Sequence, residues 1–373
     1  MKCCFVLSHI NKSTQWLWYS QELKKRNIDH FYIIISDSNT CYLVNDLERE
    51  NIKVFLLSHK SFSSHGVNLL KTCHILRQEK PDVVHTSLPY GNLIGQVSAW
   101  LSGIKNRITT CENSSWANDY ASKKQKIIDK IAFRLSKKII ATCETSKEYL
   151  HEHWGINADK IKVVGQVLKL GIYRNLSIES INELKKQLGI HENDFVIGMI
   201  ARFEFWKGHS YVIQAINELK TKIPNLKLVL LGSKGPEFDN IMSSVRIYNI
   251  ENIVSYHGFI DAVPEFLHSI NIHIHVPTNK FVETYGLNII EGMACGCAQI
   301  LTKSGIAVTT AHHMENCLIV DYCSVNEIVN AVIMLYQNSE LREKIGKNAK
   351  NYAEENFKIS VKVDNSMAIY KNN

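Results

Sequence analysis

Short apolar runs alternate with amphipathic stretches along nearly the whole chain. Most of these runs are apolar throughout rather than at every second position, which is typical of strands buried on both faces of a parallel sheet. The pattern predicts strands at residues 3–7, 31–35, 54–57, 83–85, 108–110, 139–142, 161–164, 195–200, 226–231, 253–256, 272–275, 299–302 and 318–320. Segments long enough for crossover helices separate most of them, for example 15–26, 91–101, 124–135 and 211–221. The chain is therefore predicted to be an α/β protein with doubly wound sheets.

The strands fall into two series. The first ends near residue 164, and a polar helix at residues 178–188 precedes the second. A chain of 373 residues with 45% hydrophobic content can bury two cores of ordinary size. We therefore expect two Rossmann-like domains with the seam near residues 165–175, and a long helical tail at 345–370 with a break near 357–360.

Charge is distributed unevenly between the two series. The net charge is +7, but residues 1–170 hold 24 Lys and Arg against 15 Asp and Glu, while the rest of the chain is slightly acidic. A basic field faces nucleic acid, an anionic membrane surface or an acidic substrate. A nucleic-acid binder is disfavoured, because no helix-turn-helix, zinc pattern or aromatic and basic interleaving is present.

One basic stretch has helical spacing. Its cations surround the apolar residues Ile127, Ile131 and Leu135, and they are Lys123, Lys126, Lys130, Arg134, Lys137 and Lys138. Such a stretch is either a solvated helix face or an amphipathic helix that docks on an anionic membrane.

Cysteine and histidine spacing gives no metal motif. The ten cysteines include no CxxC pair, and we expect buried thiols in a reducing compartment. His273 and His275 alternate on a predicted strand without a third ligand, so they are predicted to be core or cleft histidines. The first apolar run is too short for a signal peptide, and no window is long enough to span a membrane. These features favour a cytoplasmic protein.

Two acidic residues and a glycine follow the predicted strand at 272–275. Glu283 lies in the loop, Gly286 at the mouth of a predicted helix, and Glu291 on that helix. A helix N-terminus supplies free N–H groups and a positive dipole end, and carboxylates accept hydrogen bonds from hydroxyls. This arrangement suits a ligand that has both phosphates and hydroxyls. A surface helix with ordinary acidic residues would have the same sequence pattern.

Two cations follow the strand at 195–200. Arg202 ends this strand and Lys207 lies in the short loop before the next predicted helix. Both therefore stand at the carboxyl end of a parallel strand, where α/β sheets bind ligands. Arginine can hold two phosphate oxygens and lysine adds a point charge, although two solvated surface cations remain the alternative.

Together these stretches carry a family resemblance. An Arg202-x4-Lys207-Gly208 loop precedes a Glu283-x7-Glu291 segment by about 75 residues, and the flanking segments 224–232, 257–259 and 291–296 match as well. The chain resembles the retaining GT-B-type glycosyltransferases of family 4, continuously over residues 195–296 and more loosely elsewhere. The resemblance implies two Rossmann-like domains facing across a cleft. Residues 1–170, with a C-terminal helix at about 356–373, would bind the acceptor, and residues 171–355 would bind the nucleotide sugar.

The resemblance also implies roles for the motif residues. Arg202 and Lys207 would hold the donor pyrophosphate and neutralise the departing nucleoside diphosphate, which implies a metal-independent enzyme without a cofactor. Glu283 would face the donor sugar near its anomeric carbon, and Glu291 would accept hydrogen bonds from the ribose. Donor binding would also use backbone N–H groups at Gly286 and Leu287. Lys207→Ala and Arg202→Ala are each expected to weaken donor binding and to leave the fold intact.

Several positions depart from the family pattern. The usual Gly-rich loop after the first strand is replaced by residues 8–14, where His9 stands on the acceptor side. Glu112 occupies the place where many relatives have a histidine, and it is the second acceptor-side candidate. The loop at residues 304–308 lacks the family's Gly-Gly-x-Pro-Glu sequence. These changes do not affect the residues expected to bind the donor, and they leave open how the acceptor is bound.

The sequence thus predicts a retaining hexosyltransferase. It would move a sugar from a nucleotide donor, expected to be UDP-linked, to a hydroxyl of a lipid-linked or surface-polysaccharide acceptor. An anionic membrane at the inner face of the plasma membrane is a candidate partner for the basic half, with a solvated helix face as the alternative. The alternative is a catalytically weak GT-B protein that binds a nucleotide sugar or a partner glycosyltransferase.

Overall fold

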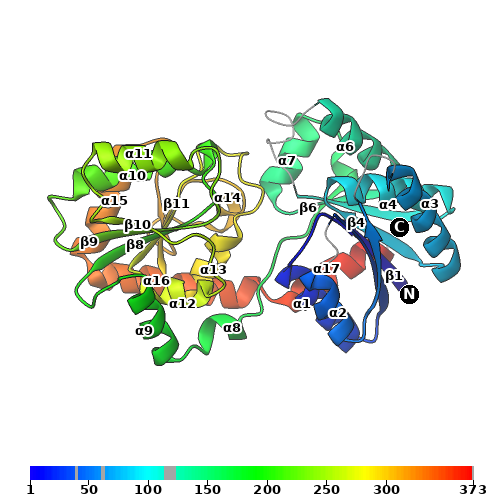
Figure 1. Ribbon diagram of the computed structural model, residues 1–373, viewed down its shortest axis with the longest axis horizontal. Helices are drawn as coiled ribbons and strands as arrows, with labels where there is room; N and C mark the ends of the chain where they lie inside the picture. Colours follow the sequence, from blue (N-terminus) through cyan, green and yellow to red (C-terminus); the bar gives the residue numbers. More distant parts are fainter. Residues whose placement is uncertain (38–40, 60–63, 113–122, 372–373) are drawn as a thin grey trace. The chain divides into compact units, whose positions relative to one another are not determined.

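A computed structural model describes residues 1–37, 41–59, 64–112 and 123–371. The chain forms two compact units, and the second is continuous in sequence. Unit 1 comprises Met1–Val167 and Ile359–Asn373, and unit 2 comprises Leu168–Lys358. Both ends of the chain therefore belong to unit 1 (Figure 1).

Unit 1 is built on a seven-stranded parallel sheet with the order β3-β2-β1-β4-β5-β6-β7. Its strands are β1 (Lys2–Ser8), β2 (Asp29–Ser36), β3 (Lys53–Ser58), β4 (Val83–Ser87), β5 (Asn106–Cys111), β6 (Lys138–Ala141) and β7 (Ile161–Val163). Its helices are α1 (Thr14–Lys25), α2 (Tyr42–Arg49), α3 (Ser64–Glu79), α4 (Pro89–Leu101), α6 (Lys123–Leu135), α7 (Glu144–Glu152) and α17 (Ile359–Lys371), with a short 3-10 turn at Ala158–Lys160. The strand order reverses between β1 and β4, which makes this position the topological switch point.

Helices cover both faces of this sheet (Figure 1). Phe5 and Leu7 of β1 point into a core shared with α1, α2 and α17, whereas Cys4 and Val6 point into a core shared with α3 and α4. Successive residues of a strand face opposite sides, so a strand buried on both faces is usually apolar at successive positions. This is why the apolar runs predict the strands of this unit. β4 is an exception, because it also buries the polar residues His85, Thr86 and Ser87.

Unit 2 repeats the same topology with a six-stranded parallel sheet, ordered β10-β9-β8-β11-β12-β13. Its strands are β8 (Phe195–Ile200), β9 (Leu226–Leu231), β10 (Val254–Tyr256), β11 (Ile272–His275), β12 (Ala298–Leu301) and β13 (Leu318–Ile319). Its helices are α8 (Gly171–Arg174), α9 (Ile178–Gln187), α10 (His209–Leu219), α11 (Phe238–Ile247), α12 (Val263–Ser269), α13 (Leu287–Cys295), α14 (Ala307–Thr310), α15 (Val325–Gln337) and α16 (Ser339–Asn356), with a 3-10 turn at Phe205–Lys207. Here the switch point lies between β8 and β11.

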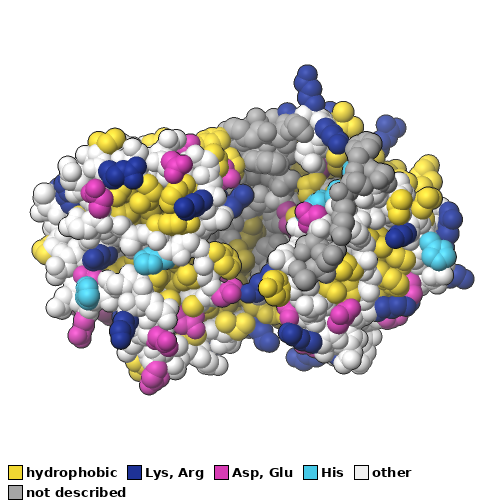
Figure 2. Space-filling view, viewed as in Figure 1, with side chains coloured by type: hydrophobic (Ala, Val, Ile, Leu, Met, Phe, Trp, Pro, Cys, Tyr) yellow, Lys and Arg dark blue, Asp and Glu magenta, His cyan; other side chains and the backbone are white. Residues whose placement is uncertain are grey.

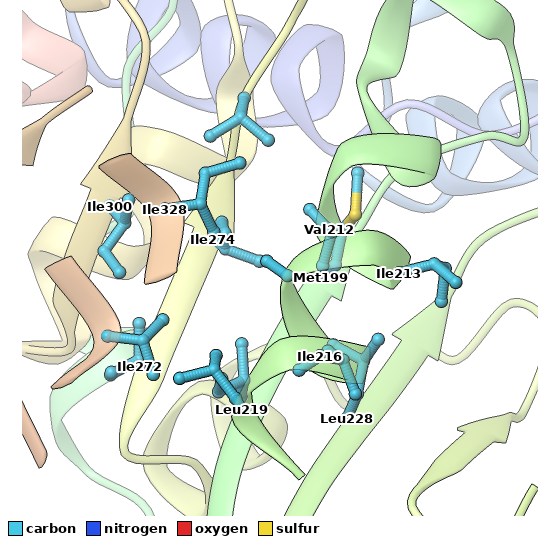
Figure 3. Close-up of a cluster of buried hydrophobic side chains, with 14 of the residues drawn as sticks. Met199, Val212, Ile213, Ile216, Leu219, Leu228, Ile272, Ile274, Ile300 and Ile328 are labelled. Atoms are coloured by element: carbon cyan, nitrogen blue, oxygen red, sulfur yellow. The ribbon is translucent and has the colours of Figure 1, made fainter. Parts of the chain in front are cut away.

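The larger core of unit 2 lies between this sheet and the helices α10 and α15. Figure 3 shows Met199, Ile272 and Ile274 from the strands packed near Val212 and Ile216 of α10. Because Ile272 and Ile274 face this core, the alternate residues of β11, His273 and His275, face the opposite side of the sheet. Both histidines are buried there.

Every strand predicted from the apolar runs is present, with ends displaced by at most two residues. The prediction that each strand is buried on both faces is wrong for β3, where Leu56 is 41% exposed. β3 is one of the two edge strands of this sheet, so it has a hydrogen-bonded neighbour on one side only. The tail divides into α16 and α17 at residues 357–358, where the break was expected.

Candidate active site

The candidate site in unit 2 lies at the topological switch point. Lys207 follows β8 and Glu283 follows β11, and these two strands are neighbours whose connections run to opposite sides. The Lys207 Nζ forms an ion pair with the Glu283 carboxylate, and the same oxygen, Oε2, lies 3.1 Å from Nε2 of His275. Lys207, 76 residues from Glu283 in the sequence, and His275, eight residues from it, therefore meet at one oxygen of the Glu283 carboxylate.

Glu283 is almost fully buried, at 9% exposure. Burial alone would raise the pKa of its carboxyl group, but Lys207 and His275 outweigh that effect and leave the pKa well below its ordinary value. Glu283 is therefore a carboxylate at neutral pH. A buried charge with two fixed partners is held in one geometry, as a binding site requires.

His275 is fixed as one tautomer by its neighbours. The amide nitrogen of Asn288 can only donate, and it lies 2.9 Å from Nδ1 of His275 and 2.7 Å from the carbonyl oxygen of Ile200. Nδ1 is therefore the acceptor, and Nε2–H donates to Glu283. Burial lowers the pKa of His275, with the Glu283 carboxylate acting in the opposite direction, so a neutral imidazole is expected at pH 7.

Two glycines allow the backbone segments around Lys207 and Glu283 to lie close together. Gly208 has φ +82°, and a Cβ there would lie 2.1 Å from the carbonyl oxygen of Val276, directly after β11. Gly286 has φ +87° and caps the N-terminus of α13, where a Cβ would lie 2.8 Å from Cδ1 of Ile289. Only glycine adopts such conformations at low cost. Gly208 therefore lets the loop of Lys207 lie against the end of β11, and Gly286 leaves the N-terminus of α13 accessible.

Glu291 lies on α13, one turn from its N-terminal end. Its Oε1 accepts a hydrogen bond from Oη of Tyr173 on α8 at 2.8 Å. Burial raises the pKa of Glu291, and the hydrogen bond from Tyr173 opposes that shift. Tyr173 thus orients Glu291 and occupies one oxygen, which leaves Oε2 as the second acceptor of the carboxylate.

Arg202 is separate from the Lys207 network. Its side chain is 64% exposed, and its ion-pair partner is Glu204 at 3.6 Å. The structure therefore places both predicted cations after β8 but gives them different surroundings: Lys207 is a nearly buried, paired ammonium, and Arg202 is an exposed guanidinium.

The acceptor-side candidates lie in unit 1, where they follow two different strands of the sheet. His9 follows β1 with φ +50°, is exposed, and its ring lies 5.3 Å from that of His59. Glu112 follows β5, and its Oε1 accepts a hydrogen bond from Oγ of Ser87 at 2.5 Å. Burial raises the pKa of Glu112, opposed by Ser87 and Lys362.

Three residues that position the carboxylates of Glu283 and Glu291 were not predicted from the sequence. His275 was expected to be a core or cleft histidine, and its position on the face of β11 opposite Ile274 is the signal that could have linked it to Glu283. Asn288 and Tyr173 carry no motif signal, because their contacts depend on how β8, α8 and α13 meet in space.

Comparison with known proteins decides the family. The family model described as "Glycosyl transferases group 1" matches residues 180–352, and the model described as "Glycosyltransferase Family 4" matches residues 19–166. The chain belongs to the group 1 glycosyltransferases. The resemblance carried by the Arg202, Lys207, Glu283 and Glu291 segments is thereby confirmed at the level of the family.

Relatives and solved structures agree with this membership. The glycosyltransferase is 26% identical over 345 residues to the capsular polysaccharide biosynthesis glycosyltransferase CapM of Staphylococcus aureus, which covers 91% of this chain and 88% of CapM. It is 29% identical over 188 residues to N-acetyl-alpha-D-glucosaminyl L-malate synthase of Bacillus anthracis, a match that covers 50% of this chain and 48% of that relative. The crystal structure of Anabaena HepE in complex with UDP and glucose matches 100% of both chains with a TM-score of 0.85 at 20% identity. The fold is thus GT-B, as predicted.

The described part of the glycosyltransferase contains neither a membrane-spanning helix nor a cluster of metal ligands. None of its helices, within residues 1–37, 41–59, 64–112 and 123–371, combines the length and apolar character needed to span a bilayer. In the same described part, no three His, Cys, Asp or Glu side chains are grouped in a way that could hold a metal ion. All ten cysteines are described; nine are buried, Cys323 is exposed, and none is in a disulfide.

Proposed function

We propose that this glycosyltransferase moves a hexosyl group from a UDP-linked donor to a hydroxyl of a lipid-linked or surface-polysaccharide acceptor, with retention of anomeric configuration and without a metal ion. The observation that supports this proposal most strongly is the Lys207–Glu283–His275 network at the switch point of unit 2. The printed names of two similar proteins support the proposal: CapM is assigned to capsular polysaccharide biosynthesis, and HepE has been crystallised with UDP-glucose.

In the proposed reaction, the bond between the donor's anomeric carbon and the phosphate oxygen breaks, and the acceptor oxygen forms a new bond to that carbon. The departing diphosphate takes the electron pair of the broken bond, and the acceptor hydroxyl passes its proton to the diphosphate oxygen that has left. Lys207 and Arg202 would neutralise this charge, together with N–H groups at Gly286 and Leu287 at the N-terminus of α13. Preorganised donors at a developing charge are among the largest contributors to catalysis.

Glu283 would orient the donor sugar. Its carboxylate is fixed by Lys207 and His275, so a hydroxyl that donates to it finds an acceptor already in place. Ser304 holds the backbone of the same residue, because the Glu283 N–H lies 3.3 Å from Oγ of Ser304. The loop that departs from the family pattern therefore supports Glu283 instead of disrupting it.

Glu291→Gln is expected to raise the Michaelis constant for the donor about tenfold and to change kcat much less. The proposed ribose hydrogen bonds are made equally in the ground and transition states, and a hydrogen bond to a charged group contributes about 1.5–3 kcal/mol. Initial-rate kinetics with varied donor concentration measure the two constants separately. A larger loss in kcat than in affinity would place Glu291 at the reacting centre instead.

Binding to an anionic membrane is a second part of the proposal, and it rests on α6. Ile127 and Ile131 are 59% and 41% exposed on this helix, while Ala132 and Phe133 face the core. Its exposed cations flank the two isoleucines, and they are Lys123, Lys124, Lys130 and Arg134. Figure 2 shows Lys and Arg side chains beside hydrophobic ones on the part of unit 1 where α6 lies.

The double variant Lys130→Ala/Arg134→Ala is expected to bind anionic vesicles about 30-fold more weakly, because each cation near such a surface contributes about 1 kcal/mol. Co-sedimentation with vesicles of phosphatidylglycerol and phosphatidylcholine measures the change. The control Lys186→Ala/Lys347→Ala removes two cations from unit 2 and is expected to bind like the unchanged protein. Equal binding by both double variants would exclude α6 as the docking helix.

The transfer reaction itself is tested by incubating the protein with UDP-hexoses and a membrane extract. Release of UDP that depends on the extract supports transfer. A shift in the melting temperature with a UDP-hexose, but no UDP release with any acceptor preparation, would support the catalytically weak alternative.

A further inference from the structure

The two histidines of β11 lie on the buried face of the sheet that α13 covers, and a side-chain amide holds each of them. Asn288 of α13 contacts Nδ1 of His275 at 2.9 Å, and Gln299 of β12 contacts Nδ1 of His273 at 2.8 Å. Each of these four side chains is at most 9% exposed. Buried polar groups are costly unless they are hydrogen-bonded, so each contact determines where the ring carries its proton.

Gln299 fixes His273 with its proton on Nδ1. The Gln299 Nε2 donates to the carbonyl oxygen of Ile289 on α13 at 3.0 Å, because a carbonyl can only accept. The Gln299 Oε1 therefore faces His273 and accepts from Nδ1–H. The other ring nitrogen, Nε2, has no hydrogen-bond partner among the described residues. A Cβ at Gly292 would lie 2.8 Å from Oε1 of Gln299, so this glycine leaves room for the pair beneath α13.

Asn288 fixes His275 in the opposite sense, with its proton on Nε2. The amide nitrogen of Asn288 donates to the carbonyl oxygen of Ile200 at 2.7 Å, so the same nitrogen faces Nδ1 of the ring. A proton on Nδ1 would point at a nitrogen that can only donate. The two contacts tie the second residue of α13 to the last residues of β8 and β11. They also direct the ring N–H to Glu283, whose Oε2 lies 3.1 Å from Nε2.

The orientation of the Glu283 carboxylate depends on this tautomer. Lys207 and His275 both bind Oε2, which leaves Oε1 as the oxygen for a donor hydroxyl. If His275 carried its proton on Nδ1 instead, the lone pair of Nε2 would face Oε2 and the two would repel each other. The tautomer that Asn288 selects is therefore the one that holds the carboxylate in place.

The surroundings of His275 also keep its ring uncharged at neutral pH. Burial lowers its pKa, the Glu283 carboxylate opposes that shift, and the Lys207 ammonium adds to it. In the described part of the chain, the other titratable groups around it are His273 on the same strand and His209 at the start of α10. Burial lowers the pKa of His273 to about 4 and that of His209 to about 3, so both of these rings are neutral as well.

We propose that Asn288 is a positioning residue of the donor-sugar site. It acts through His275: its amide keeps the imidazole neutral with Nε2–H on Glu283, so that Oε1 of the carboxylate is already oriented when the donor binds. The inference rests on the proposed function, because it assigns Asn288 to donor-sugar binding in that reaction. Gln299 and His273 repeat the same chemistry on the same sheet, and no hydrogen bond or ion pair joins either of them to Glu283 among the described residues. They provide the matched control.

The first measurement is the protonation state of His275, by nitrogen NMR of the isotope-labelled, full-length protein without substrate. At about pH 7 the ring should carry a proton on Nε2 and none on Nδ1. The signals are assigned by their absence in His275→Gln. In Asn288→Asp the introduced carboxylate lies beside Nδ1, so it should raise the pKa of the ring and leave both nitrogens protonated.

Asn288→Ala removes the amide without adding a charge, and it serves if Asn288→Asp does not fold. Both tautomers of His275 should then be populated, because nothing at Nδ1 selects between them. Three results would overturn the proposal: an Nδ1–H tautomer in the unchanged protein, a ring that stays neutral in Asn288→Asp, or a ring that remains entirely Nε2–H in Asn288→Ala.

The second measurement is kcat for UDP release with a membrane extract as acceptor, relative to the unchanged protein at the same pH. At about pH 8, Asn288→Asp is expected to lower kcat about 10–100-fold, because the neutral ring turns its proton to the introduced carboxylate and Glu283 loses a hydrogen bond. At about pH 6 the doubly protonated ring donates to both carboxylates, so about a tenfold recovery is expected.

Gln299→Glu places a carboxylate beside His273 in the same way, and its relative kcat should be equal at both pH values. Combining Asn288→Asp with His275→Gln should also remove the recovery at low pH. A merely structural role of Asn288 would lower kcat equally at both pH values. That result, or a recovery of the same size in Gln299→Glu, would overturn the proposal.

Failure of this inference and failure of the proposed function give different results. The expected tautomers, with UDP-hexose binding that Asn288→Asp weakens more at high pH than at low pH but no UDP release, would support the positioning role and contradict the transfer reaction. UDP release by a protein in which His275 has the other tautomer would contradict only the role of Asn288.

Discussion

Lys207→Ala is expected to lower kcat/KM for the donor by about 10²–10³-fold, because it removes a preorganised cation from the departing phosphate. It is also expected to lower the free energy of unfolding by about 3–5 kcal/mol, because Glu283 would be left as a buried carboxylate without its cation. Steady-state kinetics and urea unfolding measure the two effects. The expectation from sequence that Lys207→Ala leaves the fold intact therefore changes, since the structure pairs Lys207 with a buried charge.

Arg202→Ala is the matched comparison. Its guanidinium is 64% exposed, so stability should stay within about 0.5 kcal/mol of the unchanged protein while donor affinity falls. Equal losses of stability in the two variants would contradict the different environments of these cations. Unchanged kinetics in both would remove them from the donor site.

Glu283→Gln is expected to reduce kcat by about 10²-fold and to destabilise unit 2. Glutamine can still accept from Nε2 of His275, but it loses the charge that pairs with Lys207. The effect on stability depends on pH. Because the folded-state pKa of Glu283 lies below its ordinary value of 4.5, the ion pair contributes fully above pH 4.5 and its contribution is lost as the pH falls through the folded-state value.

The difference in unfolding free energy between the unchanged protein and Glu283→Gln should therefore be constant from pH 7 to about pH 5 and shrink at lower pH. Chemical denaturation at a series of pH values measures this difference. Glu251→Gln, at an exposed position of unit 2, controls for loss of a carboxylate and should show no such dependence. A difference that grows as the pH falls would mean that Glu283 is not the stabilising anion.

The fold could be predicted from sequence because parallel strands buried on both faces are apolar at most positions. The run at 272–275 is an instructive exception, since it alternates isoleucine with histidine. Ile272 and Ile274 predicted a strand, but the sequence alone did not show that His275 faces the loop of Glu283. That contact depends on how the chain folds back after β11, which a pattern of single residues does not encode.

The candidate site could be predicted only in part, for a related reason. Spacing placed Arg202, Lys207, Glu283 and Glu291 after two strands of one sheet. The adjacency of β8 and β11, which brings Lys207 to Glu283, comes from the crossover topology. In unit 1, Glu112 was proposed as an acceptor-side residue from its place after β5, and that role stays a prediction. Lys362 was not proposed, because it lies on a helix about 250 residues later and no local signal links it to Glu112.

The most direct test follows a radiolabelled hexose from UDP-hexose into product, in the presence of a membrane extract and excess chelator. The unchanged protein is expected to release UDP and to place an equal amount of label in a glycan or lipid-linked product, with the anomeric configuration of the donor. Lys207→Ala should reduce both signals about 10²–10³-fold. Binding of UDP-hexose without release of UDP in every acceptor preparation, or transfer at an undiminished rate by Lys207→Ala, would contradict the account.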